Sequence, residues 1–102
     1  MSTRKQKPLL SDAELEQIAR HFRLLGEPMR LKILQAVCQT PLTVTEIVAA
    51  TGATQANVSK HLALLAAAGI LQRQRDGQRV FYGVQERLVI ELCELVRAQL
   101  AE

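Results

Sequence analysis

Small polar side chains gather in one short segment of the chain, residues 54–60, together with a single cation. Gln55 and Asn57 carry amides, which can hydrogen-bond an adenine at two positions because an amide both donates and accepts. Ser59 and Lys60 add a hydroxyl and an ammonium group, which bind bases or phosphate oxygens. The same mixture is also typical of an ordinary solvated helix face, so both interpretations stay open for this segment alone.

The helical pattern of residues 55–68 would hold these groups on one face. Thr54 is a suitable N-cap, and Gly69 ends the segment. An apolar stripe recurs at helical spacing, formed by Val58, Leu62 and Leu65. The opposite face is small and polar, as a helix entering the major groove requires. His61 lies at the edge of the stripe, where we expect a role in packing or a contact with DNA phosphate.

A second group of cations falls on a predicted β-hairpin. Residues 70–75 and 78–83 are predicted strands, and the Asp76-Gly77 pair between them favours a two-residue turn. We expect its basic and amide side chains to gather around the tip of the hairpin: Arg73, Arg75, Gln78 and Arg79. Such arginines can bind phosphate or a narrow minor groove, but charge also protects an edge strand from aggregation.

The remaining elements are predicted to be helices. Ser11 and Thr43 begin capping boxes, in which an N-cap side chain and a glutamate three residues later satisfy backbone N–H groups. Further helices are predicted from Pro28 to before Pro41 and over residues 86–100. The order is four helices, a hairpin and a last helix. It predicts a mainly α fold with a small β-hairpin, a winged helix-turn-helix.

Length and composition indicate one globular domain. The 102 residues are 48% hydrophobic and 23% charged, and domains usually contain roughly 100–200 residues. We expect a flexible basic arm at residues 1–10 and a single domain over residues 11–102. No apolar run approaches the roughly 18 residues of a membrane span, and no apolar signal core follows the start, so we expect a cytoplasmic protein without a membrane partner.

Charge and residue content narrow the class of function. Residues 51–82 carry four cations against one acidic residue, whereas residues 83–102 carry two arginines against four glutamates. This distribution suits a polyanionic partner of the middle segment. Neither a Ser/His/Asp order, a Gly-rich phosphate loop nor a clustered carboxylate pair occurs, so we expect no enzyme and no cofactor. A protein-interaction module without DNA binding is the alternative, although such a module would carry acidic or bulky residues on the outward face of residues 55–68.

The last predicted helix carries more apolar residues than a small domain can bury. They cover more than one face: Leu88, Val89, Leu92, Cys93, Leu95 and Val96. Because a second copy of the chain would cover this surplus, we expect a homodimer.

Several segments, taken together, resemble the ArsR/SmtB family of bacterial winged-helix repressors. They are residues 24–30 (LLGEPMR), 30–34 (RLKIL), 56–62 (ANVSKHL) with Leu65, 68–71 (AGIL) and 77–82 (GQRVFY). The resemblance covers roughly residues 15–96. It implies a homodimer closed by the first and last helices, double-stranded operator DNA bound by the fourth helix, and repression that a small inducer lifts.

Two metal sites of that family lack their ligands in this chain. Thr43 and Thr45 stand where the family's Cys-x-Cys pair lies, and no histidine follows His61 to supply the site along the last helix. A metal site is therefore not expected from the sequence. Cys38 and Cys93 remain as the soft, reactive groups. Some members of the family sense oxidants or persulfides through one cysteine in each of the corresponding helices, although the positions here are offset from that pattern by a turn or more. Free cysteines are most often core residues, a thiol switch is the second interpretation and metal ligation the least favoured. An inducer site not visible in the sequence is the alternative.

Overall fold

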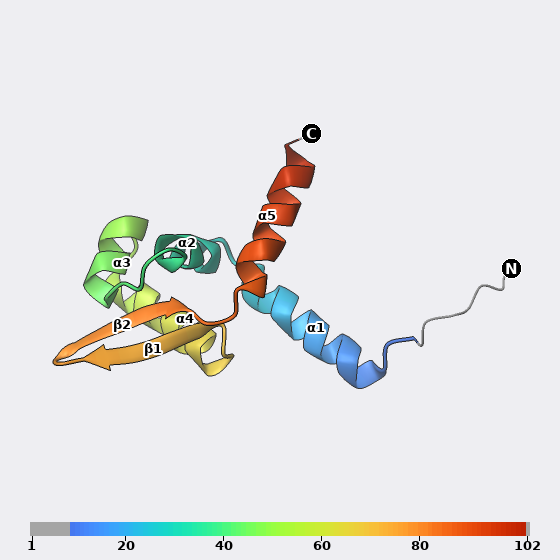
Figure 1. Cartoon of the computed structure of the whole chain (residues 1–102), viewed down its shortest axis with the longest axis horizontal. Helices are drawn as coiled ribbons and strands as arrows, with labels where there is room; N and C mark the ends of the chain where they lie inside the picture. The colour runs from blue at the N-terminus through green and yellow to red at the C-terminus, as the bar shows by residue number, and fades with distance from the viewer. Residues whose placement is uncertain (1–8, 102) are drawn as a thin grey trace, which may run out of the picture.

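The computed structural model describes residues 9–101, which form five helices and one two-stranded antiparallel hairpin (Figure 1). Their bounds are α1 Asp12–Leu25, α2 Pro28–Val37, α3 Val44–Thr51, α4 Gln55–Ala67, β1 Leu71–Asp76, β2 Arg79–Val84 and α5 Leu88–Leu100. The expected winged helix-turn-helix order is confirmed. Residues 1–8 of the expected basic arm lie outside the described residues. Within residues 9–101, no helix is both long and apolar enough to cross a bilayer.

Side-chain caps begin α1, α3 and α4 where the sequence predicts. The Glu14 N–H donates to the Ser11 hydroxyl at 3.1 Å, and the Ser11 N–H donates to the Glu14 carboxylate at 2.8 Å. Thr43 and Glu46 form the same reciprocal pair before α3. Gly52 ends α3 with a φ of +76°, a conformation that a residue with a Cβ adopts at a cost, and so makes the tight turn into α4.

The core lies between α2, α3, α4 and the base of the hairpin, with one residue from α5. Its buried apolar side chains are Ile33, Leu34, Val37, Ile47, Val58, Leu62, Leu65, Ile70, Leu71 and Val89. The chain before α3 attaches the hairpin to this core. The Leu42 N–H donates to the Tyr82 carbonyl at 3.0 Å, and the Tyr82 N–H donates to the Leu42 carbonyl at 2.8 Å. The hairpin is therefore held along β2 as well as at its base.

The hairpin turn differs by one residue from the predicted one. Asp76 pairs with Arg79, so the two-residue loop is Gly77–Gln78, and both strands lie one position later than expected. Gly77 has a φ of +67°, while no non-glycine residue in the described part of the chain has a positive φ. This pattern fits a type II′ turn, which needs glycine at the first central position, whereas Asp-Gly as the loop would need positive φ at both positions.

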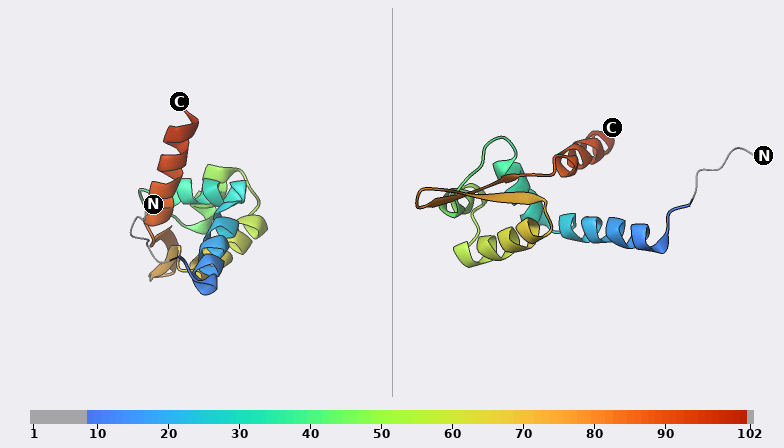
Figure 2. Two further views of the ribbon diagram at one scale, coloured as in Figure 1. Left: turned by 90° about the vertical axis from the view of Figure 1, so that its right-hand side faces the viewer. Right: turned by 60° about the horizontal axis from the view of Figure 1, so that its bottom comes forward.

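Helices α1 and α5 project away from the core on the side opposite the hairpin tip (Figures 1 and 2). The radius of gyration is 16.8 Å, where ~13 Å is typical of a domain of 100 residues. No side chain of α1 is buried, and Val89 is the buried residue of α5, which begins two residues later than expected. The apolar side chains left exposed on the two helices are Leu15, Ile18, Phe22, Leu88, Leu95, Val96 and Leu100.

A hollow of about 300 Å³ lies between these helices, lined by residues that include Phe22, Leu92 and Leu100. We expect Leu92→Glu to weaken self-association at least about tenfold, because burial of a leucine side chain contributes about 1.5–3 kcal/mol. Sedimentation velocity at micromolar concentration measures the effect. Glu91→Gln, an exposed neighbour on α5, serves as the control. A wild-type chain that stays monomeric at that concentration would contradict the prediction.

Candidate nucleic-acid interface

The exposed side of α4 carries small and polar side chains. The Thr54 hydroxyl accepts from the Asn57 N–H at 3.2 Å and so caps the helix. Gln55, Asn57, Ser59 and Lys60 are all exposed. The predicted apolar stripe on the opposite side is buried in the core, so the rotational setting of α4 predicted from its sequence is confirmed. The exposed N-terminal turn also offers free backbone N–H groups, which favour a phosphate.

His61 does not lie on this polar face. Its side chain is buried, with 6% of the residue exposed, and its Nδ1 accepts a hydrogen bond from Arg30 Nε–H at 3.1 Å. Burial lowers the pKa of the imidazole, and the cations of Arg30 and Lys60 lower it further against the opposing effect of Glu27. The burial of His61 and its hydrogen bond to Arg30 favour the packing role that the sequence left open over a contact with DNA phosphate.

The register of the hairpin separates the arginines that were expected around one tip. Side chains alternate across a strand, so Arg73 and Arg75 share the face of Leu71, which is buried in the core. Arg79 lies on the other face, with its Cζ 5.2 Å from the centre of the Phe81 ring. Gln78 lies in the turn. The cations of the hairpin therefore form two groups on opposite faces.

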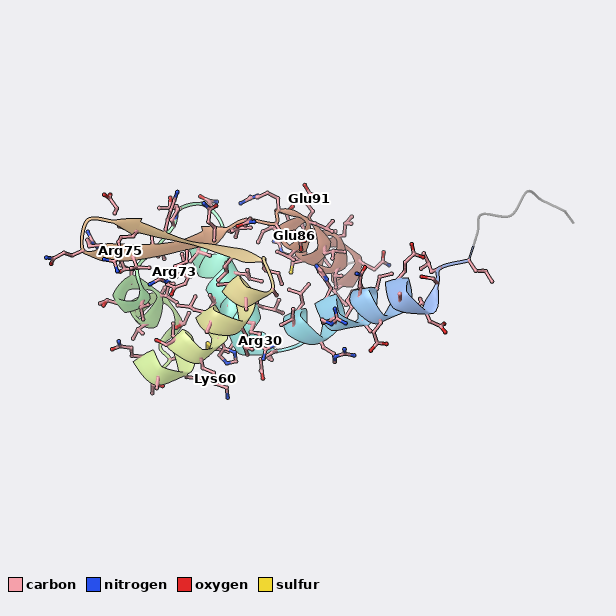
Figure 3. The ribbon with its side chains drawn as sticks, turned by 90° about the horizontal axis from the view of Figure 1, so that it is seen from below. Arg30, Lys60, Arg73, Arg75, Glu86 and Glu91 are labelled. Atoms are coloured by element: carbon pink, nitrogen blue, oxygen red, sulfur yellow. The ribbon has the colours of Figure 1, made fainter. Side chains whose placement is uncertain are left out.

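Arg79 is also turned toward the start of α3. Its Nη2 lies 3.9 Å from Oε2 of Glu46. The Thr43 N–H, which donates to the other carboxylate oxygen of Glu46, lowers the pKa of that carboxyl group, and Arg79 lowers it further. Because Glu46 is thus charged, it partly neutralises Arg79. In Figure 3, Lys60 on α4 and Arg73 and Arg75 on the hairpin all lie in the half of the molecule away from α1.

Both cysteines are free, half-buried and close to the junction of α2 and α5. They line the same cavity of about 430 Å³, together with Glu94 and Arg97. Next to it, the Arg87 guanidinium donates to the Cys38 carbonyl at 2.8 Å and so ties the start of α5 to the end of α2. Among the described residues, no group of three or more His, Cys, Asp or Glu side chains is placed to hold a metal ion.

Known proteins match both the sequence and this fold. A family model described as "Bacterial regulatory protein, arsR family" matches residues 27–73. A probable mercury resistance operon repressor of Streptomyces lividans is 38% identical over 84 residues, which cover 82% of this chain and 67% of that protein. The chain belongs to the ArsR family of bacterial regulatory proteins.

Other ArsR-type proteins agree with this assignment. A transcriptional repressor SmtB homolog of Synechocystis is 28% identical over 97 residues, which cover 95% of this chain and 74% of the homolog. The homodimeric winged helix-turn-helix DNA-binding domain Mb0332 of Mycobacterium bovis superposes with a TM-score of 0.78 at 32% identity. That match covers 91% of this chain and 89% of the Mb0332 chain. The chain is thus a winged helix-turn-helix transcription regulator.

Sequence reasoning missed Arg30 as part of this ArsR-family site. Arg30 lies 31 residues before His61, and no spacing rule links two residues so far apart on different helices. The sequence feature that could have indicated a partner is the position of His61 next to the apolar stripe of α4, because an imidazole buried there needs a hydrogen-bond partner. The candidate interface is therefore the exposed polar face of α4, backed by the part-buried hydrogen bond between Arg30 and His61.

The lowered pKa of His61 predicts a pH dependence of stability. In the unfolded chain His61 has an ordinary pKa near 6.5, so below that pH the unfolded state binds more protons than the folded one. The free energy of unfolding should therefore fall as the pH drops from 7.5 to 5.5. Urea denaturation at both pH values measures this change.

His61→Asn keeps a hydrogen-bond acceptor but has no titrating group, so it should reduce the pH dependence. His21→Gln controls for the other histidine, whose Nε2 lies 3.0 Å from Glu86 Oε1. An unchanged pH dependence in His61→Asn would contradict the prediction.

Proposed function

We propose that this ArsR-family regulator is a homodimeric repressor that binds double-stranded operator DNA and leaves it when a small inducer acts. The observation that carries the proposal is the setting of α4. Its apolar stripe is buried, and the face with Gln55, Asn57, Ser59 and Lys60 is exposed. A helix with small polar side chains outward can enter the major groove, where amides distinguish one base pair from another.

The basic side chains supply affinity that does not depend on base sequence. Lys60 on α4 and Arg75 on the hairpin lie in the half of the molecule away from α1 (Figure 3), so a duplex along α4 can also meet the hairpin. Neutralising phosphates releases counterions and makes binding fall with salt. Arg79 contributes less, because Glu46 already lies 3.9 Å from its guanidinium.

Exposed apolar surface on α1 and α5 supports the homodimer, as does the homodimeric state of Mb0332. A two-fold axis through these helices would present two copies of α4 to one side of a duplex. Helix-turn-helix dimers bind half-sites about one turn apart, ~34 Å. The operator is therefore an inverted repeat.

We place the action of the inducer at the cavity shared by Cys38 and Cys93. A peroxide would oxidise the two thiols to a disulfide, with the peroxide reduced to two waters by the two electrons and two protons that the thiols release. Because Arg87 holds the Cys38 carbonyl at this junction, a bond between α2 and α5 would shift α5 within the dimer. A soft metal ion is the second candidate, since thiolates prefer such ions and the Streptomyces relative is a mercury resistance repressor.

Substitutions on α4 test the assignment of the base-reading face. We expect Gln55→Ala and Asn57→Ala to lower discrimination between the preferred and altered base pairs by about 1–3 kcal/mol. Arg75→Ala should weaken binding to all sequences alike and reduce the salt dependence. Fluorescence anisotropy on a site selected from a random duplex pool measures both effects.

The matched control is Arg79→Ala, which should change affinity less than Arg75→Ala because Arg79 is engaged by Glu46. If Asn57→Ala keeps wild-type selectivity, the reading face is wrongly assigned. If the wild-type chain selects no sequence, the chain is a winged-helix interaction module and the proposed function is wrong.

Cysteine variants test the inducer site. Cys38→Ser and Cys93→Ser should each bind DNA like the wild type, since neither residue lies on the polar face of α4. Each should abolish release of DNA by hydrogen peroxide, and mass spectrometry should show the disulfide only in the wild type. The same titration with mercuric ion distinguishes metal binding. If both variants release DNA normally on treatment with peroxide and with mercuric ion, the cysteines are core residues.

A further inference from the structure

A single guanidinium group, that of Arg30 in the first turn of α2, bridges the first and fourth helices. Its Nε–H donates to Nδ1 of His61 on α4 at 3.1 Å. Its Nη1–H donates to the carbonyl oxygen of Leu24, in the last turn of α1, at 3.3 Å. Figure 3 shows Arg30 lying beside α4. One side chain thus connects a helix that carries exposed apolar surface with the helix that carries the polar face.

The chemistry of the guanidinium group determines which atoms donate and which accept in this bridge. A guanidinium is planar, carries its donors in a fixed fork and accepts no hydrogen bond. His61 Nδ1 must therefore be the acceptor, and the imidazole is neutral with its proton on Nε2. Because the ring is buried, it moves with α4. When both hydrogen bonds are made, the positions of the Leu24 carbonyl and of α4 are set relative to each other.

Helix α1 packs against the core only at its last turn, through the partly buried Leu24 and Leu25. No side chain of α1 is buried in the chain as described. Among residues 9–101, the other side-chain hydrogen bond from α1 to a distant element joins His21 to Glu86, which lies before α5 and not on α4. Among the side-chain hydrogen bonds of the described residues, those of Arg30 are therefore the ones that join α1 to α4.

We infer that Arg30 is a positioning residue for operator recognition, which sets the separation of the two α4 helices in the dimer. The inference rests on the proposed function, because it requires a dimer closed by α1 and α5 that reads two half-sites. Base preference within a half-site comes from α4 itself and does not need Arg30. Loss of Arg30 should then relax the preference for half-site spacing and leave the base preference unchanged.

The experiment uses duplexes in which only the spacing changes. Wild-type protein first selects an inverted repeat from a random duplex pool. Affinity is then measured for that repeat and for versions with one or two base pairs added or removed between half-sites. Wild type should bind the selected spacing best. Arg30→Gln should lose that spacing preference while retaining the half-site sequence preference.

A charge control and a coupling test separate positioning from simpler effects. Lys32→Gln removes one exposed cation from the same helix and should keep the wild-type spacing preference. His61→Leu removes the acceptor and should reproduce the effect of Arg30→Gln. The double variant should add nothing further, because both changes break the same bridge.

Three results would overturn the inference. The first is an Arg30→Gln protein that folds and dimerises by light scattering but keeps the wild-type spacing preference. The second is kept spacing preference with a reduced salt dependence, which would make Arg30 a phosphate contact. If Arg30→Gln does not fold, Arg30→Lys is measured in its place, because one ammonium group cannot reproduce the forked donors of the guanidinium. The third result is an Arg30→Lys protein that keeps the wild-type spacing preference. A wild-type chain that selects no repeat would instead overturn the proposed function.

Discussion

The small apolar core between α2, α3, α4 and the hairpin base is the constraint on which the rest of the structure depends. Ten buried side chains form it, and three of them lie on one side of α4. Because that side of α4 is buried, the opposite side must lie at the surface. The exposure of Gln55 and Asn57 is therefore a consequence of core packing, and the same contacts that stabilise the fold orient its polar face.

The same core is too small to cover the apolar residues of α1 and α5. Phe22 and Leu95 remain 59% and 69% exposed, although burying such side chains is among the strongest contributions to stability. A monomer therefore keeps an unfavourable surface that a second copy can remove. The surfaces that we propose for dimerisation and for DNA reading are thus separate, and the two hydrogen bonds of Arg30 join the helices that carry them.

Charge in the hairpin is organised by pairing register as much as by residue content. Arg73 and Arg75 fall on one face and Arg79 on the other because the strands pair as Asp76 with Arg79. Glu46, ionised through its capping hydrogen bond from Thr43, lies close to Arg79. The backbone bridge at Leu42 positions the hairpin, and the exposed pair of Arg79 with Glu46 adds little to it.

Much of this protein is determined by its sequence alone, because helix caps and helical periodicity are local properties. Ser11, Thr43 and Thr54 cap helices as predicted, and a rotation of 100° per residue is enough to orient α4. Tertiary packing alone decided the burial of His61 against Arg30, the shift of the hairpin by one residue, and the cavity shared by both cysteines. These features join residues 31 or more positions apart, or select between adjacent turns that differ little in local free energy, so only the packed chain specifies them.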